Sequence, residues 1–105
     1  MKKFIYTEED AKKIYFTSDT HFSHEAIIKY CCRPFKTVEE MDETLVQNWN
    51  EVVPEDGIVF HLGDVGFGQP KYINDILRRL NGKIYLVIGN HDWRRVTTQH
   101  AWRFE

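Results

Sequence analysis

Cysteine is scarce in this sequence, and its placement excludes a disulfide framework. The 105 residues include two cysteines, Cys31 and Cys32, which are adjacent in the chain. A disulfide between neighbouring residues is strained and rare, so we expect two free thiols in a reducing cytoplasm. No surrounding motif marks either cysteine as a catalytic nucleophile, and we expect one or both of them to pack against the core.

The sequence also lacks a large excess of charge of one sign and any long apolar run. The formal net charge is −2 at pH 7, which offers little electrostatic attraction to nucleic acids. The basic start of the chain is not followed by the apolar core of a signal peptide. No stretch approaches the ~20 apolar residues of a membrane span, so we expect a single small soluble domain over residues 1–105 with no membrane partner.

Three short apolar stretches have the composition of buried β-strands. They cover residues 14–18, 58–62 and 84–88 and are rich in β-branched and aromatic residues. Between them, apolar residues recur every three or four positions, which predicts amphipathic helices. The order strand, helices, strand, helix, strand favours an α/β fold with a mostly parallel sheet flanked by helices.

The predicted helices carry start and stop signals. Thr37 and Glu40 have the spacing of a capping box at the start of the longest helix. Pro34 ends the short helix before it, and Pro70 can open the last helix at its first turn. The apolar stripe of the longest helix predicts the positions that face the core: Val38, Met41, Leu45, Trp49 and Val52.

Side chains that can bind metal follow each predicted strand directly. The first strand runs into SDTHF, the second into LGDVG and the third into GNHD. The carboxyl ends of parallel strands meet at one edge of a sheet, so these clusters should converge there. Their carboxylates would repel one another and lose hydration unless a cation were present. Histidine nitrogen mixed with carboxylate and amide oxygen suits Mn, Fe or Zn better than Ca.

The spacing within the first two clusters predicts how they bind metal. Asp19 and His21 are two residues apart, so on an extended strand they would point the same way and could share one ion. Asp64 lies between Gly63 and Gly66, which allow the backbone to turn and the carboxylate to reach inward. Its two oxygens could bridge two metal ions about 3.5–4 Å apart.

The motifs D-x-H, G-D and G-N-H-D, each after a strand and in this order, resemble those of the calcineurin-like metallophosphoesterase superfamily. The stretch FTSDTHFSHEAIIKYCCRPF is similar to the small single-domain bacterial and phage members. The resemblance extends from Lys13 to the end of the chain. It implies the N-terminal part of a four-layer α/β/β/α sandwich. It also implies a hydrolase of phosphomonoesters or phosphodiesters, in which a metal-bound hydroxide at a dinuclear site attacks phosphorus.

The resemblance also implies the metal ligands. Asp19 and His21 would bind the first ion, Asp64 would bridge both ions, and Asn90 would bind the second. Two divalent transition-metal ions are expected, chosen from Mn, Fe, Zn or Ni, with Mn favoured. The substrate would be a phosphate ester, and a nucleic acid could enter only as substrate.

The last two residues of the G-N-H-D motif would take part in catalysis. By the resemblance, His91 would stay off the metals and either protonate the leaving alkoxide or stabilise charge on the phosphoryl oxygens. Asp92 would orient His91 by accepting its other ring N–H.

The chain departs from the family after this motif. Family members carry further histidines, including a late G-H-x-H motif, that complete both metal shells, whereas only His100 follows here. We therefore expect an incomplete domain whose exposed sheet edge favours a homo-oligomer. The alternative function is that of a truncated, inactive phosphoesterase fragment that binds metal weakly or self-assembles. A Ca²⁺ module is a third interpretation, but its ligands should all be oxygen and His21 contradicts it.

Three further side chains each have two interpretations. Arg33 could bind a phosphate oxygen of the substrate or serve a structural role at the turn of Pro34. His24 could touch the substrate or lie on the surface at a helix N-terminus. His61 lies within a predicted strand, which favours a place in the core or on a sheet face over metal binding.

Overall fold

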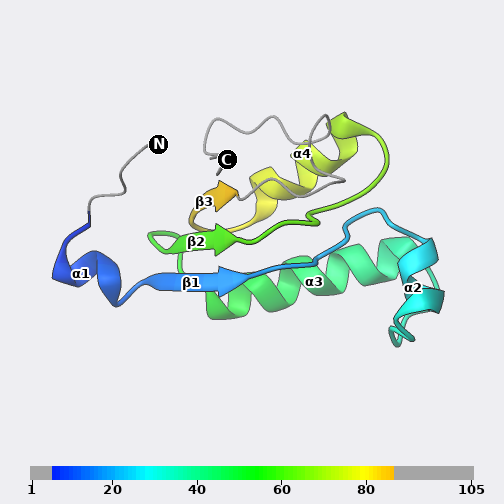
Figure 1. Cartoon of the computed structure of the whole chain (residues 1–105), viewed down its shortest axis with the longest axis horizontal. Coiled ribbons are helices and arrows are strands. Elements are labelled where there is room, and N and C mark those ends of the chain that lie inside the picture. Colours follow the sequence, from blue (N-terminus) through cyan, green and yellow to red (C-terminus); the bar gives the residue numbers. More distant parts are fainter. Residues whose placement is uncertain (1–5, 87–105) are drawn as a thin grey trace.

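The computed structural model describes residues 6–86, which form a three-stranded sheet and four helices. The strands are β1 (Ile14–Thr17), β2 (Ile58–His61) and β3 (Lys83–Leu86), hydrogen-bonded in the order β1-β2-β3. Both pairings are parallel, and Figure 1 shows the three arrowheads pointing the same way. The predicted α/β fold is confirmed, and it is consistent with the N-terminal part of the implied sandwich.

The helices are α1 (Glu8–Ala11), α2 (Ala26–Tyr30), α3 (Val38–Val52) and α4 (Pro70–Arg79). In Figure 1, α1 lies at the amino end of the strands, whereas α2 and the first turns of α3 and α4 lie beyond the carboxyl end. None of the described helices has the length and apolarity needed to cross a membrane.

The predicted caps of α3 and α4 are present, with one shift. The Thr37 side chain accepts the backbone N–H of Glu40 at 3.1 Å, as expected for an N-cap. The Glu40 carboxylate accepts from the N–H of Lys36, one residue further back than a capping box requires. Pro70 opens α4, where its missing N–H costs no helical hydrogen bond.

One core joins the sheet to α3 and α4. Buried side chains of α3, α4, β2 and β3 pack together in a single apolar cluster. The helices contribute Val46, Trp49, Ile73, Ile76 and Leu77, and the strands contribute Val59, Ile84 and Leu86. Alternation along the strands turns Phe16, Phe60 and Tyr85 to the other face, where their rings stack 5.5 and 5.4 Å apart. Phe16 is 69% exposed, so this end of the aromatic face meets solvent.

The buried face of α3 differs by one residue from the prediction at its carboxyl end. Met41 and Trp49 are buried as expected, but Val46 is buried as well and Val52 is 64% exposed. Val53, just after the helix, takes the buried position. The apolar pairs 45–46 and 52–53 fit two helical faces equally well, so the pattern alone could not choose between them.

The expected packing of Cys31 and Cys32 against the core is wrong, because both are exposed, although both are free as predicted. Ile27 is the buried residue of α2, and Cys31 would share its face if the helix continued. The helix ends at Tyr30 instead, and Cys32 adopts a left-handed backbone with φ of 50°. This turn carries both thiols away from the core.

Candidate metal centre

The loops that follow β1 and β2 are hydrogen-bonded to each other along their length. The Asp19 N–H donates to the carbonyl of Gly63 at 3.0 Å, and the His21 N–H donates to the carbonyl of Asp64 at 3.1 Å. Further along, Phe22 forms a parallel bridge with the second loop. The backbone pairing of the two strands therefore continues beyond their ends and brings the first two predicted clusters together.

Glycine allows the closest approach of these loops. A Cβ atom on Gly66 would lie 2.6 Å from the carbonyl oxygen of Phe22, closer than real Cβ contacts come. Gly63 turns the chain with φ of 114°, a conformation that glycine adopts without steric cost. The two glycines that flank Asp64 thus act in different ways, one through its backbone angle and one through its lack of a side chain.

The predicted ligands Asp19, His21 and Asp64 all have left-handed backbones, with φ of 56°, 51° and 53°. The strand geometry assumed for the D-x-H spacing is therefore wrong, because β1 ends at Thr17 and neither ligand is extended. Such conformations cost of order 1–3 kcal/mol each for residues with a Cβ and tend to gather at functional sites. The hydrogen bonds between the loops hold these residues in that conformation.

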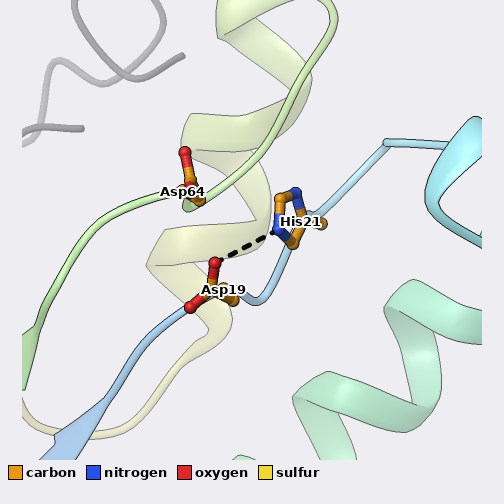
Figure 2. A group of neighbouring side chains, drawn as sticks. All are labelled: Asp19, His21 and Asp64. Carbon is orange, nitrogen blue, oxygen red and sulfur yellow. Dashed lines mark ion pairs between the residues drawn. The ribbon is translucent and has the colours of Figure 1, made fainter. Parts of the chain in front are cut away.

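The three side chains nevertheless lie close together, and Figure 2 shows His21 and Asp19 facing each other with Asp64 on the neighbouring loop beside them. Nε2 of His21 lies 3.4 Å from Oδ1 of Asp19, and one donor atom from each of the three residues lies within 4.8 Å of the others. Ligands of a transition-metal ion lie about 2.0–2.2 Å from it, so small side-chain rotations would let one ion contact all three. Two carboxylates and an imidazole also form a donor set of the kind that such ions favour.

The Asp19 carboxyl is held in the form that metal binding needs. A hydrogen bond from the Ser18 side chain is the main cause that lowers its pKa, and the neighbouring His21 lowers the pKa further. Burial acts in the opposite direction, but the side chain is 60% exposed. The Asp19 carboxylate is therefore ionised at neutral pH, which is the form that a metal ligand must have.

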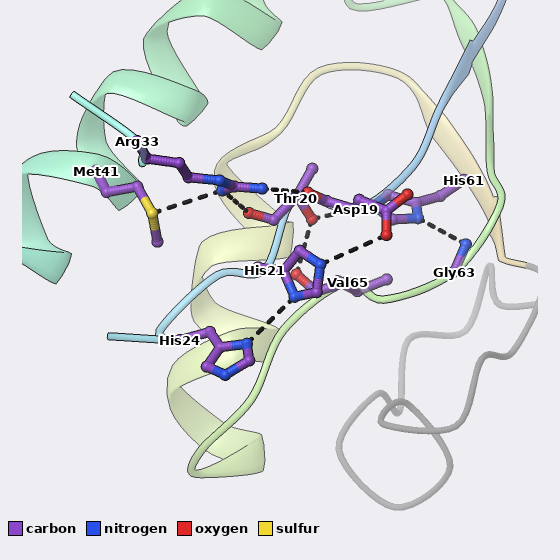
Figure 3. A network of polar contacts seen from close by, with 9 residues as sticks. All are labelled: Asp19, Thr20, His21, His24, Arg33, Met41, His61, Gly63 and Val65. Carbon is purple, nitrogen blue, oxygen red and sulfur yellow. Dashed lines mark hydrogen bonds and ion pairs between the residues drawn. The ribbon is translucent and has the colours of Figure 1, made fainter. Parts of the chain in front are cut away.

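A buried chain of hydrogen bonds lies beneath the ligands and is drawn in Figure 3. The Thr20 hydroxyl donates to the carbonyl of Val65 at 2.7 Å, so it accepts from Nε2 of His61 at 3.0 Å. Nδ1 of His61 then accepts the N–H of Gly63 at 3.1 Å. His61 is fully buried and neutral in this arrangement, which confirms its place in the core and ties the two loops together.

Arg33 stabilises the loop after β1 through hydrogen bonds to its backbone. Its guanidinium donates to the carbonyl of Asp19 at 2.7 Å and to that of Thr20 at 2.9 Å, as Figure 3 shows. The same group contacts the sulfur of Met41 at 3.5 Å. Arg33 therefore has a structural role, as one of its two interpretations predicted, but it stabilises the loop that carries Asp19 and His21 rather than the turn of Pro34. A phosphate contact by Arg33 stays a prediction.

Asp42 is a buried acid that the sequence pattern did not single out. It lies on α3 and is 3% exposed. Its two oxygens accept the Ser23 N–H at 2.9 and 3.1 Å, and one of them accepts the Tyr72 hydroxyl at 3.2 Å. Burial raises the pKa of the Asp42 carboxyl. Its position beside Met41, on the core side of an amphipathic helix, was the signal that could have revealed it.

His24 contacts His21, one of the candidate ligands, directly. Its Nδ1 lies 3.2 Å from Nδ1 of His21, and its ring stacks on Phe67 with 5.1 Å between centroids. The residue precedes α2 and is partly buried, so its contacts place it against His21 and Phe67 rather than only on the surface. Substrate contact by His24 stays a prediction. The remaining predicted site residues, Asn90, His91 and Asp92, lie outside the described residues.

Comparison with known proteins covers nearly the whole chain. The family model for calcineurin-like phosphoesterases matches residues 12–105. An uncharacterized protein of Methanocaldococcus jannaschii is 52% identical over 83 residues, which are 77% of this chain and 47% of that protein. The gene 66 protein of Mycobacterium phage L5 is 36% identical over 81 residues, which are 74% of this chain and 39% of that protein.

A solved structure has a similar fold. The crystal structure of a protein of unknown function from Aquifex aeolicus has a TM-score of 0.60 and 32% identity. The match covers 77% of this chain and 44% of that one. The chain spans less than half the length of each of these three relatives.

Proposed function

Because the chain belongs to the calcineurin-like phosphoesterase family, we propose that it acts as a metal-dependent hydrolase of phosphate esters. The observation that carries the proposal is the meeting of Asp19, His21 and Asp64 at the carboxyl ends of two neighbouring parallel strands. Backbone hydrogen bonds between the two loops, and those from the Arg33 side chain to the loop after β1, hold these residues in place. Such preorganisation favours metal binding because less order remains to be imposed.

Two divalent transition-metal ions are the proposed cofactors, with Mn²⁺ favoured. Asp19 and His21 would hold the first ion, Asn90 would hold the second, and Asp64 would serve both. The ions would supply Lewis acidity, which polarises the phosphoryl group and activates water at neutral pH. The mixed nitrogen and oxygen donors of the described residues support a transition metal.

His91 and Asp92 are the proposed catalytic pair. His91 would donate a proton to the leaving alkoxide or stabilise charge on the phosphoryl oxygens, and Asp92 would orient it. The order of the three motifs along the chain supports these roles. The family match over residues 12–105 supports them as well, because it includes the G-N-H-D motif.

The proposed substrate is a phosphomonoester or a phosphodiester, with nucleic acid considered only as a substrate. Cys31 and Cys32 are both exposed free thiols, which supports the reducing cytoplasm as the compartment. Self-association through a sheet edge is proposed on the ground that β1 and β3 are the outer strands of the described sheet.

Hydrolysis of bis-p-nitrophenyl phosphate and p-nitrophenyl phosphate with added Mn²⁺ tests the proposal. We expect Asp64→Asn to lower the rate about 100-fold or more, roughly 2.7 kcal/mol of transition-state stabilisation. Asp56→Asn is the matched control, because Asp56 pairs with Lys13 at the opposite end of the sheet. Equal loss in both variants would contradict the assigned site. Metal binding without hydrolysis by the unaltered chain would favour the alternative of a metal-binding protein without turnover.

A further inference from the structure

The two ring nitrogens of His21 face different partners, as Figure 3 shows. Nε2 lies 3.4 Å from the Asp19 carboxylate, on the side of the candidate metal ligands. Nδ1 lies 3.2 Å from Nδ1 of His24. A neutral imidazole carries one proton, so the tautomer of His21 decides which nitrogen offers a lone pair to a metal ion.

The contact between the two imidazoles constrains that choice. Two ring nitrogens at hydrogen-bond distance need one proton between them, with one ring as donor and the other as acceptor. If Nε2 of His21 is to bind metal, its proton must lie on Nδ1 and be donated to Nδ1 of His24. His24 then carries its own proton on Nε2. A metal-bound histidine usually gives its other N–H to a carboxylate, a carbonyl or water, and here an imidazole occupies that place.

His24 is held where this role requires it. Its backbone N–H donates to the carbonyl of His21 at 3.1 Å, a turn that sets the two rings side by side. Its ring stacks on Phe67, which comes from the loop after β2, at an interplanar angle of 28°. The N–H of Phe67 in turn donates to the carbonyl of Phe22 at 2.9 Å. Both ligand loops therefore limit the orientations of the His24 ring.

We infer that His24 is a positioning residue whose Nδ1 accepts the Nδ1–H of His21 and so directs Nε2 of His21 toward Asp19 and Asp64. The inference deepens the proposed function and rests on it in one respect, that His21 binds metal. Loss of such a partner typically lowers metal affinity about 10- to 100-fold. Asp19 is the competing partner. Its carboxylate would accept a hydrogen bond from His21 if the proton of His21 lay on Nε2 rather than on Nδ1.

Two variants of His24 separate the hydrogen bond from the packing. His24→Phe keeps an aromatic ring to stack on Phe67 but removes the acceptor. His24→Asn places an amide oxygen near the position of Nδ1 and restores the acceptor. We expect Zn²⁺ affinity, measured by calorimetry on the 105-residue chain, to fall about 10- to 100-fold in His24→Phe. We expect His24→Asn to recover most of it.

Side-chain ¹⁵N NMR of the Zn²⁺-loaded chain supplies the readout that a merely structural role would not change. In the unaltered protein, His21 should bind Zn²⁺ through Nε2 and carry its proton on Nδ1. In His24→Phe, a second population bound through Nδ1 should appear. Binding of unchanged strength through Nε2 alone in His24→Phe would overturn the inference.

The outcomes distinguish this inference from the proposed function. Zn²⁺ binding with the expected tautomer, but no hydrolysis of either nitrophenyl ester, would contradict the function and leave the inference standing. Hydrolysis with an unchanged His21 tautomer and affinity in His24→Phe would contradict the inference alone. A chain that binds no Zn²⁺ at all would contradict both.

Discussion

At the amino end of the sheet, the turn before β3 places its left-handed backbone on Gly82, with φ of 92°. At the carboxyl end, Asp19, His21 and Asp64 adopt the same region although each has a Cβ atom. A Cβ on Gly82 would lie 2.9 Å from the carbonyl oxygen of Gly57, so close packing excludes a side chain there. The carboxyl end also uses glycine in this way at Gly63, but unlike the amino-end turn it places residues with side chains in the same region as well.

The difference reflects what each end must present. The amino end needs only a tight turn, for which glycine is the least strained residue. The metal site proposed at the carboxyl end requires carboxylates and an imidazole directed at one point, and glycine could not supply them. Their backbone strain is offset by hydrogen bonds between the loops and by the buried chain through Thr20 and His61. At Asp19, His21 and Asp64, the proposed metal site explains why a side chain is retained at a left-handed position, whereas Ser23 and Cys32 share the conformation without belonging to the site.

The largest effect on stability is expected at that buried chain. Thr20→Val keeps the shape of the side chain but removes the acceptor of the His61 Nε2–H and one of the two donors to the Val65 carbonyl, which keeps the Phe22 N–H at 2.8 Å. The loss of the acceptor at His61 costs about 1–3 kcal/mol and the lost hydrogen bond to Val65 adds about 1 kcal/mol, so we expect a loss of about 3 kcal/mol. Urea denaturation measures it.

Thr17→Val is the control for Thr20→Val, because it makes the same exchange within β1. Valine suits a strand, and we expect a change of about 0.5 kcal/mol or less. Equal losses in the two variants would show that the buried chain contributes nothing particular to the carboxyl end.

The next effect is expected at the amino end. Gly82→Ala should destabilise the fold by about 1–3 kcal/mol, because the Cβ contacts the Gly57 carbonyl and φ is positive. Mn²⁺ affinity should stay unchanged, since the ligands lie at the other end. Thermal unfolding and calorimetry test the two statements separately, and a matching loss of Mn²⁺ affinity would contradict the independence of the two ends.

A gain in stability is expected when the strain at the carboxyl end is relieved. Asp19→Gly removes the Cβ from a left-handed residue and should raise the free energy of unfolding by about 0.5–1 kcal/mol. Metal binding should be lost in the same variant. Asp19→Asn, which keeps the Cβ, should lose metal binding without that gain. A stability loss in Asp19→Gly would indicate that its backbone is not strained.

The arrangement of elements was accessible from the sequence, because periodicity and turn residues report local conformation. Three strands in a parallel sheet and the meeting of Asp19 and His21 with Asp64 were predicted and found. Strand alternation does not bring Asp19 and His21 together, because both residues have left-handed backbones. Local pattern carries little information on such single-residue conformations, which depend on hydrogen bonds from a loop more than forty residues away.

The polar residues beneath the site were harder to predict for a related reason. Asp42 lies in an amphipathic helix, where an acid is normally assigned to the solvent side. Its burial follows from the Ser23 N–H and the Tyr72 hydroxyl, which the tertiary fold brings to it. Arg33 was considered as a structural residue, but its partners are carbonyls of the ligand loop. Sequence identifies such side chains as unusual, while only the fold identifies their partners.

The smallest effect is a difference in the sign of pH dependence between two carboxyl groups, the buried Asp42 near the carboxyl end of the sheet and the exposed Asp56 at its amino end. Burial raises the pKa of Asp42 in the folded chain, so the folded state binds more protons than the unfolded state between the ordinary and the raised pKa. Stability from this group therefore falls as pH rises through that interval and is constant above it.

At the amino end, a hydrogen bond from Lys13 lowers the pKa of Asp56, so its contribution is present at neutral pH and is lost as pH falls. Urea denaturation from acid to neutral pH should show that Asp42→Asn removes a decline with rising pH, whereas Asp56→Asn removes a weaker rise that salt already screens. The same sign in both variants would mean that Asp42 is not desolvated, and the carboxyl end would then lack the buried acid that ties α3 and α4 to the ligand loop.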